Sequence, residues 1–189
     1  RTGFQMSKLG RFYADCIIEN IKAGSIHHET NSLFGPAYKG IPLSVATAIS
    51  LARDYDKNLN YCFNRKEAKD HGEGGIIVGH KLQSGDRVLI VEDVITAGTA
   101  VRECLPILKK AADVHIEGLI VSVDRMERGK GKLTAIQEIY EEYGIPTYAI
   151  VTVREIINTL YKTEINGKII INEVIKEQME RYLRRQGDA

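Results

Sequence analysis

The stretch that decides the fold is VLIVEDVITAGTA, residues 88–100. Its first four residues are all large and apolar, with no polar alternation, as expected for a strand that is covered on both faces in a parallel sheet. The strand runs into two acids, Glu92 and Asp93, and then into small and hydroxyl residues at the start of a helix. We therefore predict a central parallel strand whose carboxyl end opens into a ligand-binding loop.

Outward from this stretch, segments of strand length alternate with amphipathic segments of helix length. Strands are expected near residues 32–34, 61–63, 76–78, 88–91, 118–123 and 147–151. Helices are expected near residues 7–23, 41–55, 100–111, 133–143, 155–161 and 173–185. The first helix is inferred from apolar residues at helical spacing, namely Leu9, Phe12, Tyr13, Cys16, Ile17 and Ile21. The alternation predicts an α/β fold with an open, mostly parallel sheet flanked by helices, in a single domain over residues 1–189.

The composition argues against several functional classes. The 26 basic and 25 acidic residues give a net charge of +1, which offers no reason to expect a nucleic acid or an anionic membrane surface as partner. Three cysteines that lie far apart, Cys16, Cys62 and Cys104, provide neither a disulfide framework nor a zinc pair. No run approaches the roughly 18 to 20 apolar residues of a membrane span. We therefore expect a soluble, cytoplasmic protein with reduced thiols.

The loop after the central strand has the chemistry of a ribose-phosphate site. Backbone N–H groups and hydroxyls between Thr96 and Ala100, together with the helix dipole, can bind a phosphate. Glu92 and Asp93 can accept hydrogen bonds from a cis-diol and stabilise positive charge at an anomeric carbon. The alternative is an ordinary strand-to-helix turn with an acidic N-cap. A P-loop is excluded because no Gly-Lys-Ser/Thr follows, and a dinucleotide fingerprint because Gly98 is the only glycine there.

Three other places at the predicted strand ends carry unusual residues. The string GPAYKG at residues 35–40 could grip a pyrophosphate through Lys39, or be a tight turn with a solvated lysine. The string NRKEAKDHGEGG at residues 64–75 indicates a lid with glycine hinges, and the alternative is a solvated charged loop. Arg125 follows the strand that ends at Val123, and its planar fork suits a carboxylate, although a surface arginine is the alternative.

Residues 88–100 resemble the 5-phosphoribosyl 1-pyrophosphate (PRPP) signature of type I phosphoribosyltransferases, and residues 93–100 resemble its orotate version. Glu92 departs from the aspartate that is more usual at the first acidic position. The string at 35–40 looks like the pyrophosphate loop of that family, where a strained or cis peptide is expected, and Arg65-Lys66 looks like the start of the catalytic loop.

The resemblance implies the type I phosphoribosyltransferase fold and a role for each matching residue. PRPP binding falls to Tyr38, Lys39, Arg65, Lys66, Lys69, His71, Glu92, Asp93, Val94, Ile95, Thr96, Ala97, Gly98, Thr99 and Ala100. Catalysis falls to Lys69, His71 and Asp93, and orotate binding to Thr96 and Arg125.

The implied reaction transfers the 5-phosphoribosyl group of PRPP to orotate, giving orotidine 5′-monophosphate and pyrophosphate in de novo pyrimidine (UMP) biosynthesis. Mg²⁺ is the implied cofactor, held mainly by PRPP and water rather than by protein ligands. A homodimer is implied, with the catalytic loop of one subunit, including Lys69 and His71, acting in trans on the site of the other.

The resemblance covers about residues 9–160. The family carries a segment of a few dozen residues before the first helix, with a lysine and an aromatic stretch that touch the substrates, and no counterpart is seen here. We therefore expect a complete donor site and, if this sequence is the whole molecule, weak or absent orotate binding. Two other interpretations stay open. One is a phosphoribosyltransferase for a purine or uracil, and the other is a non-catalytic module or regulator that keeps only the ribose-phosphate site.

Overall fold

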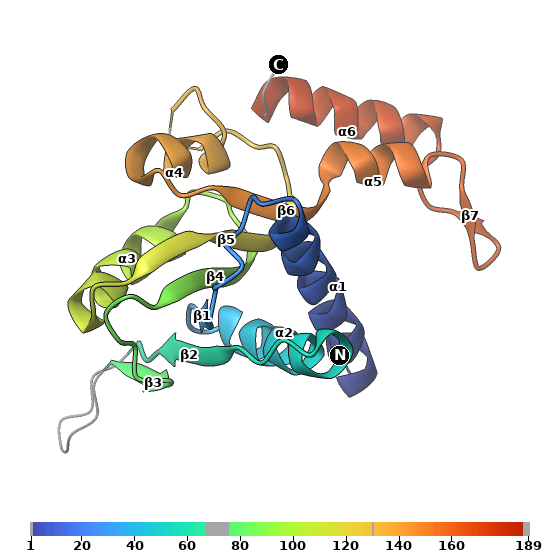
Figure 1. Cartoon of the computed structure of the whole chain (residues 1–189). Coiled ribbons are helices and arrows are strands. Elements are labelled where there is room, and N and C mark those ends of the chain that lie inside the picture. Colours follow the sequence, from blue (N-terminus) through green and yellow to red (C-terminus); the bar gives the residue numbers. More distant parts are fainter. Residues whose placement is uncertain (1, 67–75, 130, 187–189) are drawn as a thin grey trace.

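The computed structural model describes residues 2–66, 76–129 and 131–186. Its centre is a six-stranded sheet in the order β3-β2-β1-β4-β5-β6 (Figure 1). The strands are β1 (Ser32–Gly35), β2 (Asn60–Asn64), β3 (Ile77–Gly79), β4 (Arg87–Val94), β5 (His115–Asp124) and β6 (Thr147–Thr152). All neighbours are parallel except β3, which runs antiparallel to β2. The expected α/β class with an open, mostly parallel sheet flanked by helices is confirmed.

Strand β4 lies in the interior of the sheet because its apolar residues are covered from both sides. Val88 and Ile90 pack into one hydrophobic cluster, and Leu89 and Val91 pack into the other. All four are 0% exposed, as the unbroken apolar run predicts.

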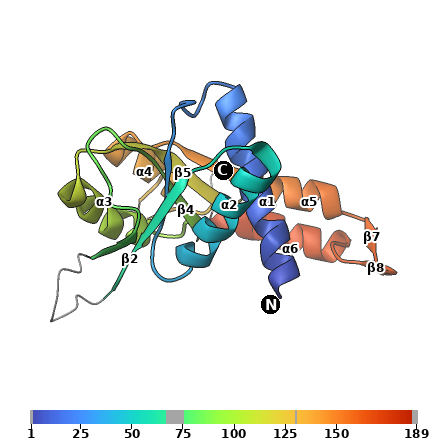
Figure 2. The same cartoon turned by 60° about the horizontal axis from the view of Figure 1, so that its bottom comes forward.

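Four helices form the two covering layers. Helices α1 (Gly3–Lys22) and α2 (Gly40–Tyr55) lie on one face, and α3 (Thr99–Ala111) and α4 (Ala135–Tyr143) lie on the other (Figure 1). Figure 2 shows α1 and α2 crossing on their shared face. They approach closely at Gly10, where an added Cβ would lie 2.5 Å from the carbonyl oxygen of Ala46. Each layer thus holds the sheet rigidly, which lets loops at the strand ends carry the site.

The C-terminal part of the chain lies beyond β6. Helix α5 (Val153–Leu160) begins immediately after that strand, and a small hairpin of β7 (Glu164–Ile165) and β8 (Lys168–Ile169) leads to α6 (Glu173–Gln186). Figure 1 shows α5 and α6 lying side by side at one edge of the molecule. Among the helices of the described residues, none has the length and apolar character that crossing a membrane requires.

The sequence-based elements are correct in type, and two features were not anticipated. The β7–β8 hairpin was missed, although its turn residues Asn166 and Gly167 both have positive φ, which is the pattern that an Asn-Gly pair favours. Phe12 was expected on the buried face of the first helix but is 52% exposed. Its neighbour Tyr13, which was expected on the same face, is fully buried.

Candidate functional site

The predicted site residues gather where β1, β2, β4 and β5 end. Since these strands are parallel, their carboxyl ends meet at one edge of the sheet. Strands β4 and β5 are paired as far as Val94 and Val123, so the loops that follow them start side by side. The sheet therefore brings the ribose-phosphate loop and Arg125 to the same edge, as predicted.

The two acids at the end of β4 differ in environment. Glu92 is 6% exposed, and one of its carboxylate oxygens accepts a hydrogen bond of 3.0 Å from the Asp93 N–H. The Asp93 side chain is 31% exposed and pairs with the Lys39 ammonium at 2.9 Å. It also accepts the Val94 N–H at 2.8 Å. One carboxylate is thus buried at the strand end, and the other is partly exposed and paired with Lys39.

This difference sets the pKa values of the pair apart. Burial, reinforced by the negative charge of Asp93, raises the pKa of Glu92 to about 7. Partial burial also acts to raise the pKa of Asp93, but hydrogen bonds from Lys39 and the Val94 N–H outweigh it and hold that pKa below its usual value. Near neutral pH, Asp93 is therefore the fixed negative charge, while Glu92 can exchange a proton.

A buried hydroxyl and a partly buried hydroxyl hold the backbone under the acids. The Tyr13 hydroxyl on α1 donates to the Glu92 carbonyl at 2.7 Å, and the Ser122 hydroxyl on β5 donates to the Asp93 carbonyl at 2.6 Å. Burial raises the pKa of Tyr13, so it stays a neutral donor. Sequence reasoning did not find either residue, because each lies far along the chain from the acids.

The loop after the acids leads into an open helix start. Gly98 occupies the N-cap position of α3 with φ of 67°, a left-handed conformation that glycine adopts without steric cost. No side chain of the described residues caps α3. The first backbone N–H groups of a helix lack partners within the helix, and the helix dipole adds positive potential there. An anion such as a phosphate is the group that this start can bind.

Arg102 anchors the outer side of this loop. Its Nη1 donates to the Ala97 carbonyl at 2.5 Å, and its Nε donates to Glu142 on α4 at 2.9 Å. The same Nη1 lies 2.7 Å from where a Cβ on Gly98 would be. The loop is thus fastened to α4 through an arginine that sequence reasoning did not single out.

The predicted pyrophosphate loop lies against the end of β4. The peptide bond between Ala37 and Tyr38 is cis, which confirms the expectation for this loop. The Ala37 N–H donates to the Asn64 side chain at 2.9 Å, tying the loop to β2. Gly40 lets the chain approach closely, since a Cβ there would meet the Val91 carbonyl oxygen at 2.7 Å. The loop's Lys39 reaches Asp93, so these two predicted site residues are in contact.

A cavity of about 570 Å³ joins these parts. Its walls include Ala37, Asn64, Arg65, Lys66, Thr99 and Ala100. Nη1 of Arg65 is buried and has no hydrogen-bond partner among the described residues. The Lys66 ammonium lies 5.6 Å from the centre of the exposed Tyr38 ring. The predicted pyrophosphate loop, the start of the predicted lid and the start of α3 therefore face one hollow that carries cationic groups.

Some predicted site residues are not brought into this cavity. Arg125 lies at the same edge but lines a different hollow, beside α6. Its Nη2 is 2.6 Å from an oxygen of Glu127. The exposed Thr96 lies in the phosphate loop, between the acids and Gly98. Lys69 and His71 lie outside the described residues, so their predicted roles stay predictions.

Comparisons with known proteins agree with this geometry. The phosphoribosyl transferase domain family matches residues 8–160. Orotate phosphoribosyltransferases of Clostridium beijerinckii and Clostridium acetobutylicum are 53% and 51% identical, each over 99% of this chain and 81% of the relative. The crystal structure of orotate phosphoribosyltransferase from Francisella tularensis is 32% identical, with a TM-score of 0.80 over 99% of this chain and 82% of that one. The chain therefore belongs to the orotate phosphoribosyltransferase family, within the phosphoribosyl transferases.

Proposed function

We propose that the protein transfers the 5-phosphoribosyl group of PRPP to N1 of orotate, in de novo pyrimidine biosynthesis. The observation that carries this proposal is the pairing of β4 with β5 up to Val94 and Val123. It sets a ribose-phosphate loop beside an arginine suited to a carboxylate, and orotate bears a carboxylate next to the nitrogen that reacts.

The order of the predicted site residues sets one direction for the donor. The 5-phosphate lies at the open start of α3, where N–H groups between Thr96 and Ala100 donate to it. The ribose hydroxyls donate to Glu92 and Asp93. The pyrophosphate then lies toward the 36–39 loop, where Lys39, Arg65 and Lys66 supply positive charge.

The chemistry needs no covalent intermediate with the protein. The bond from the anomeric carbon to pyrophosphate breaks, the bond to orotate N1 forms, and N1 loses its proton. Asp93 and ionised Glu92 stabilise positive charge on the ribose ring, and the cations stabilise the departing pyrophosphate. Holding both reactants in line can lower the barrier by about 7 to 11 kcal/mol. We assign Lys69 and His71 to the leaving group, and Arg125, with Thr96, to orotate.

Mg²⁺ is proposed to enter the site with PRPP. Mg²⁺ keeps several waters and binds mainly through substrate phosphates in such sites, where it neutralises their charge. In residues 2–66, 76–129 and 131–186, no group of three or more His, Cys, Asp or Glu gathers into a metal cage. A donor-borne ion fits this site, because the oxygens of PRPP and water complete its shell.

The protein is further proposed to act in the cytoplasm as a homodimer. Three buried cysteines, Cys16, Cys62 and Cys104, carry free thiols, which suits a reducing compartment. Lys69 and His71 lie in sequence between β2 and β3, and β3 is an edge strand of the sheet. A second subunit can approach the chain at this edge.

The activity is tested by mixing the protein with orotate, PRPP and Mg²⁺ and following the loss of orotate absorbance together with pyrophosphate release. We expect turnover that Asp93→Asn lowers sharply. Turnover with adenine or uracil but not orotate would overturn the base assignment. PRPP binding without turnover on any base would favour a non-catalytic module.

The action in trans is tested with two variants. Lys69→Ala and Asp93→Asn are each expected to be nearly inactive, whereas their mixture should regain roughly a quarter of wild-type turnover, because half of the dimers then carry one intact site of two. A mixture no more active than its parts would contradict the proposal.

A further inference from the structure

The chain turns sharply just after Arg125. The Asp124 carboxylate accepts the Met126 N–H at 2.8 Å, and Met126 has φ of 53°. A residue with a side chain is uncommon in this left-handed region, and an aspartate two residues earlier is a typical stabiliser of such a turn. The turn brings the side chain of Glu127 back beside Arg125.

Glu127 is shared between Arg125 and the last helix. Its Oε1 lies 2.6 Å from Nη2 of Arg125 and also accepts the Tyr182 hydroxyl of α6 at 2.9 Å. The Glu127 side chain is 16% exposed, against 43% for Arg125. The carboxylate is thus the fixed member of the pair, and it lies between the arginine and α6.

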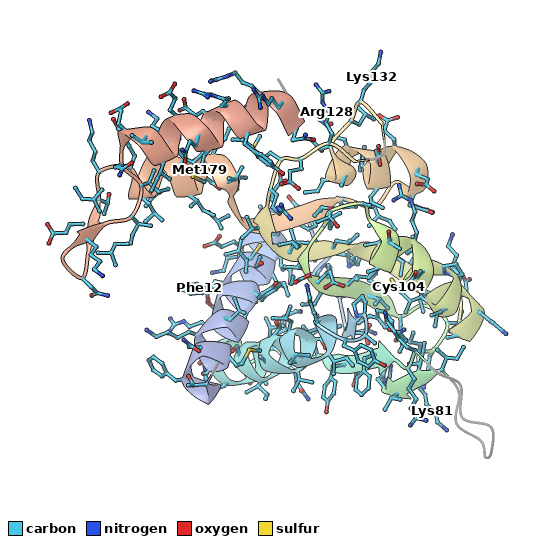
Figure 3. All side chains as sticks on the ribbon, turned by 180° about the vertical axis from the view of Figure 1, so that it is seen from behind. Phe12, Lys81, Cys104, Arg128, Lys132 and Met179 are labelled. Atoms are coloured by element: carbon cyan, nitrogen blue, oxygen red, sulfur yellow. The ribbon has the colours of Figure 1, made fainter. Side chains whose placement is uncertain are left out.

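Helix α6 holds the turn at a second point. The Arg128 N–H donates to the Gln186 carbonyl at 2.6 Å, using one of the carbonyls that a helix end leaves without a partner. Leu183, one turn before, is 7% exposed. Figure 3 labels Met179 on α6 and Arg128 in the loop near the far end of that helix. Two hydrogen bonds between the turn and α6, at Glu127 and at Arg128, therefore fix the turn that carries Arg125.

The arginine keeps donors for a ligand. The Glu127 contact uses Nη2, and the Tyr182 hydroxyl that binds Glu127 also interacts with the Arg125 guanidinium. A guanidinium has five N–H donors in a planar fork, so one edge can still bind a carboxylate with two hydrogen bonds. Holding the other side by Glu127 removes rotamer freedom that ligand binding would otherwise have to remove.

We propose that Glu127 and Tyr182 are positioning residues of the base site, and that α6 therefore takes part in recognising a pyrimidine carboxylate through Arg125. This inference rests on the proposed function. The extent of the shared family supports it, since the phosphoribosyl transferase domain match ends at residue 160 and α6 begins at Glu173. The shared domain carries the loops that bind the donor, so α6, which lies outside it, can position a residue that recognises the base.

The test compares two tyrosine variants. Tyr182→Phe removes the hydroxyl that donates to Glu127, from a side chain that is 49% exposed and can lose its hydroxyl without leaving a buried gap. Tyr161→Phe is the control, because Tyr161 also donates to a carboxylate, Glu173, in the same C-terminal region. Both proteins are compared with wild type in KM for orotate, KM for PRPP, kcat and thermal unfolding.

We expect Tyr182→Phe to raise the KM for orotate about three- to tenfold, the effect of weakening one hydrogen bond in a chain, with KM for PRPP and the unfolding temperature unchanged. Tyr161→Phe should match wild type. Glu127→Gln keeps the size of the side chain but removes its charge, and should raise the KM for orotate further.

Equal rises in both KM values, or the same rise in Tyr161→Phe, would reduce Tyr182 to a structural role and overturn the inference. An unchanged KM for orotate in both Tyr182→Phe and Glu127→Gln would also overturn it, while leaving the proposed function intact. If the wild-type protein does not use orotate, the proposed function fails, and the inference fails with it.

Discussion

Helices α2 and α3 begin differently from α4 and α5. The later pair each start with a capping box, Thr134 with Gln137 and Thr152 with Glu155. In α2 and α3 no side chain from the described residues caps the start. All four helices follow strands of the same sheet, so the difference is not one of topology.

The presence or absence of a cap indicates the role of each helix start. A capped start satisfies its own N–H groups and stabilises the fold, whereas an uncapped start leaves N–H groups that an anion can satisfy. The uncapped start of α3 lines the 570 Å³ cavity through Thr99 and Ala100, and the loop that leads into α2 lines it through Ala37. Local stability is thus given up where the proposed donor binds.

The largest effect is expected from Gly98→Ala. At φ of 67° a methyl group is strained, and it would lie 2.7 Å from Arg102 and 2.9 Å from Ile139. The strained loop should turn its N–H groups away from the phosphate and lower kcat/KM for PRPP about 10- to 100-fold. Steady-state kinetics at saturating orotate measure this.

Gly144→Ala is the control for strain alone. Gly144 ends α4 at φ of 68° with no atom within 4 Å of an added Cβ. It should lower stability by about 1 kcal/mol without changing the kinetics of PRPP. Equal losses of kcat/KM for PRPP in Gly98→Ala and Gly144→Ala would contradict the proposal that the start of α3 binds the phosphate.

A change of pH is expected to have a smaller effect on the KM for PRPP, because Glu92, at the strand end before α3, titrates near neutral pH. Burial raises the pKa of Glu92 to about 7, so its carboxylate forms as pH rises through 7. The KM for PRPP should therefore fall several-fold between about pH 6 and 8. Asp93, whose pKa is lowered, stays charged throughout this window.

The same group affects stability in the opposite sense. A pKa raised by folding means that the folded protein binds the proton more tightly, so this stabilisation is present below the unfolded value near 4.5 and is lost as pH rises through 7. Glu92→Gln should flatten both the pH profile of KM for PRPP and that of thermal unfolding. If the variant keeps both slopes, another group is responsible.

The smallest effect on activity is expected from Thr134→Ala. Removing the cap of α4 should lower the free energy of unfolding by about 1 kcal/mol, because the Gln137 N–H loses its partner at 3.2 Å. Denaturant unfolding measures the loss. The KM for PRPP should not change, and a rise like that of Gly98→Ala would show that capped starts also serve the donor site.

Much of the fold could be predicted because its signals are local. Residues 88–91 are apolar without a break, and the structure buries all four completely. The direction of β3 could not be predicted, since three apolar residues, Ile76, Ile77 and Val78, fit a parallel or an antiparallel edge strand equally well. The β7–β8 hairpin was predictable from Asn166-Gly167, and that signal was overlooked.

The site was predictable where its residues follow one another along the chain. Glu92, Asp93 and Gly98 belong to one motif, and the structure places them at one strand end as expected. The contacts that hold these residues in place join parts of the chain that are far apart in sequence. Tyr13 reaches Glu92 from 79 residues away, and Tyr182 reaches Glu127 from 55. Neither spacing nor periodicity pairs such residues, because only the packing of helices on the sheet brings them together.

The pairing of β4 and β5 also sets a length scale. Neighbouring strands lie about 4.8 Å apart, a spacing fixed by backbone hydrogen bonds rather than by side chains. The loops for the two proposed reactants start from partners in that ladder, Val94 and Val123. The sheet thus fixes how far apart the two loops start, whichever residues the loops carry.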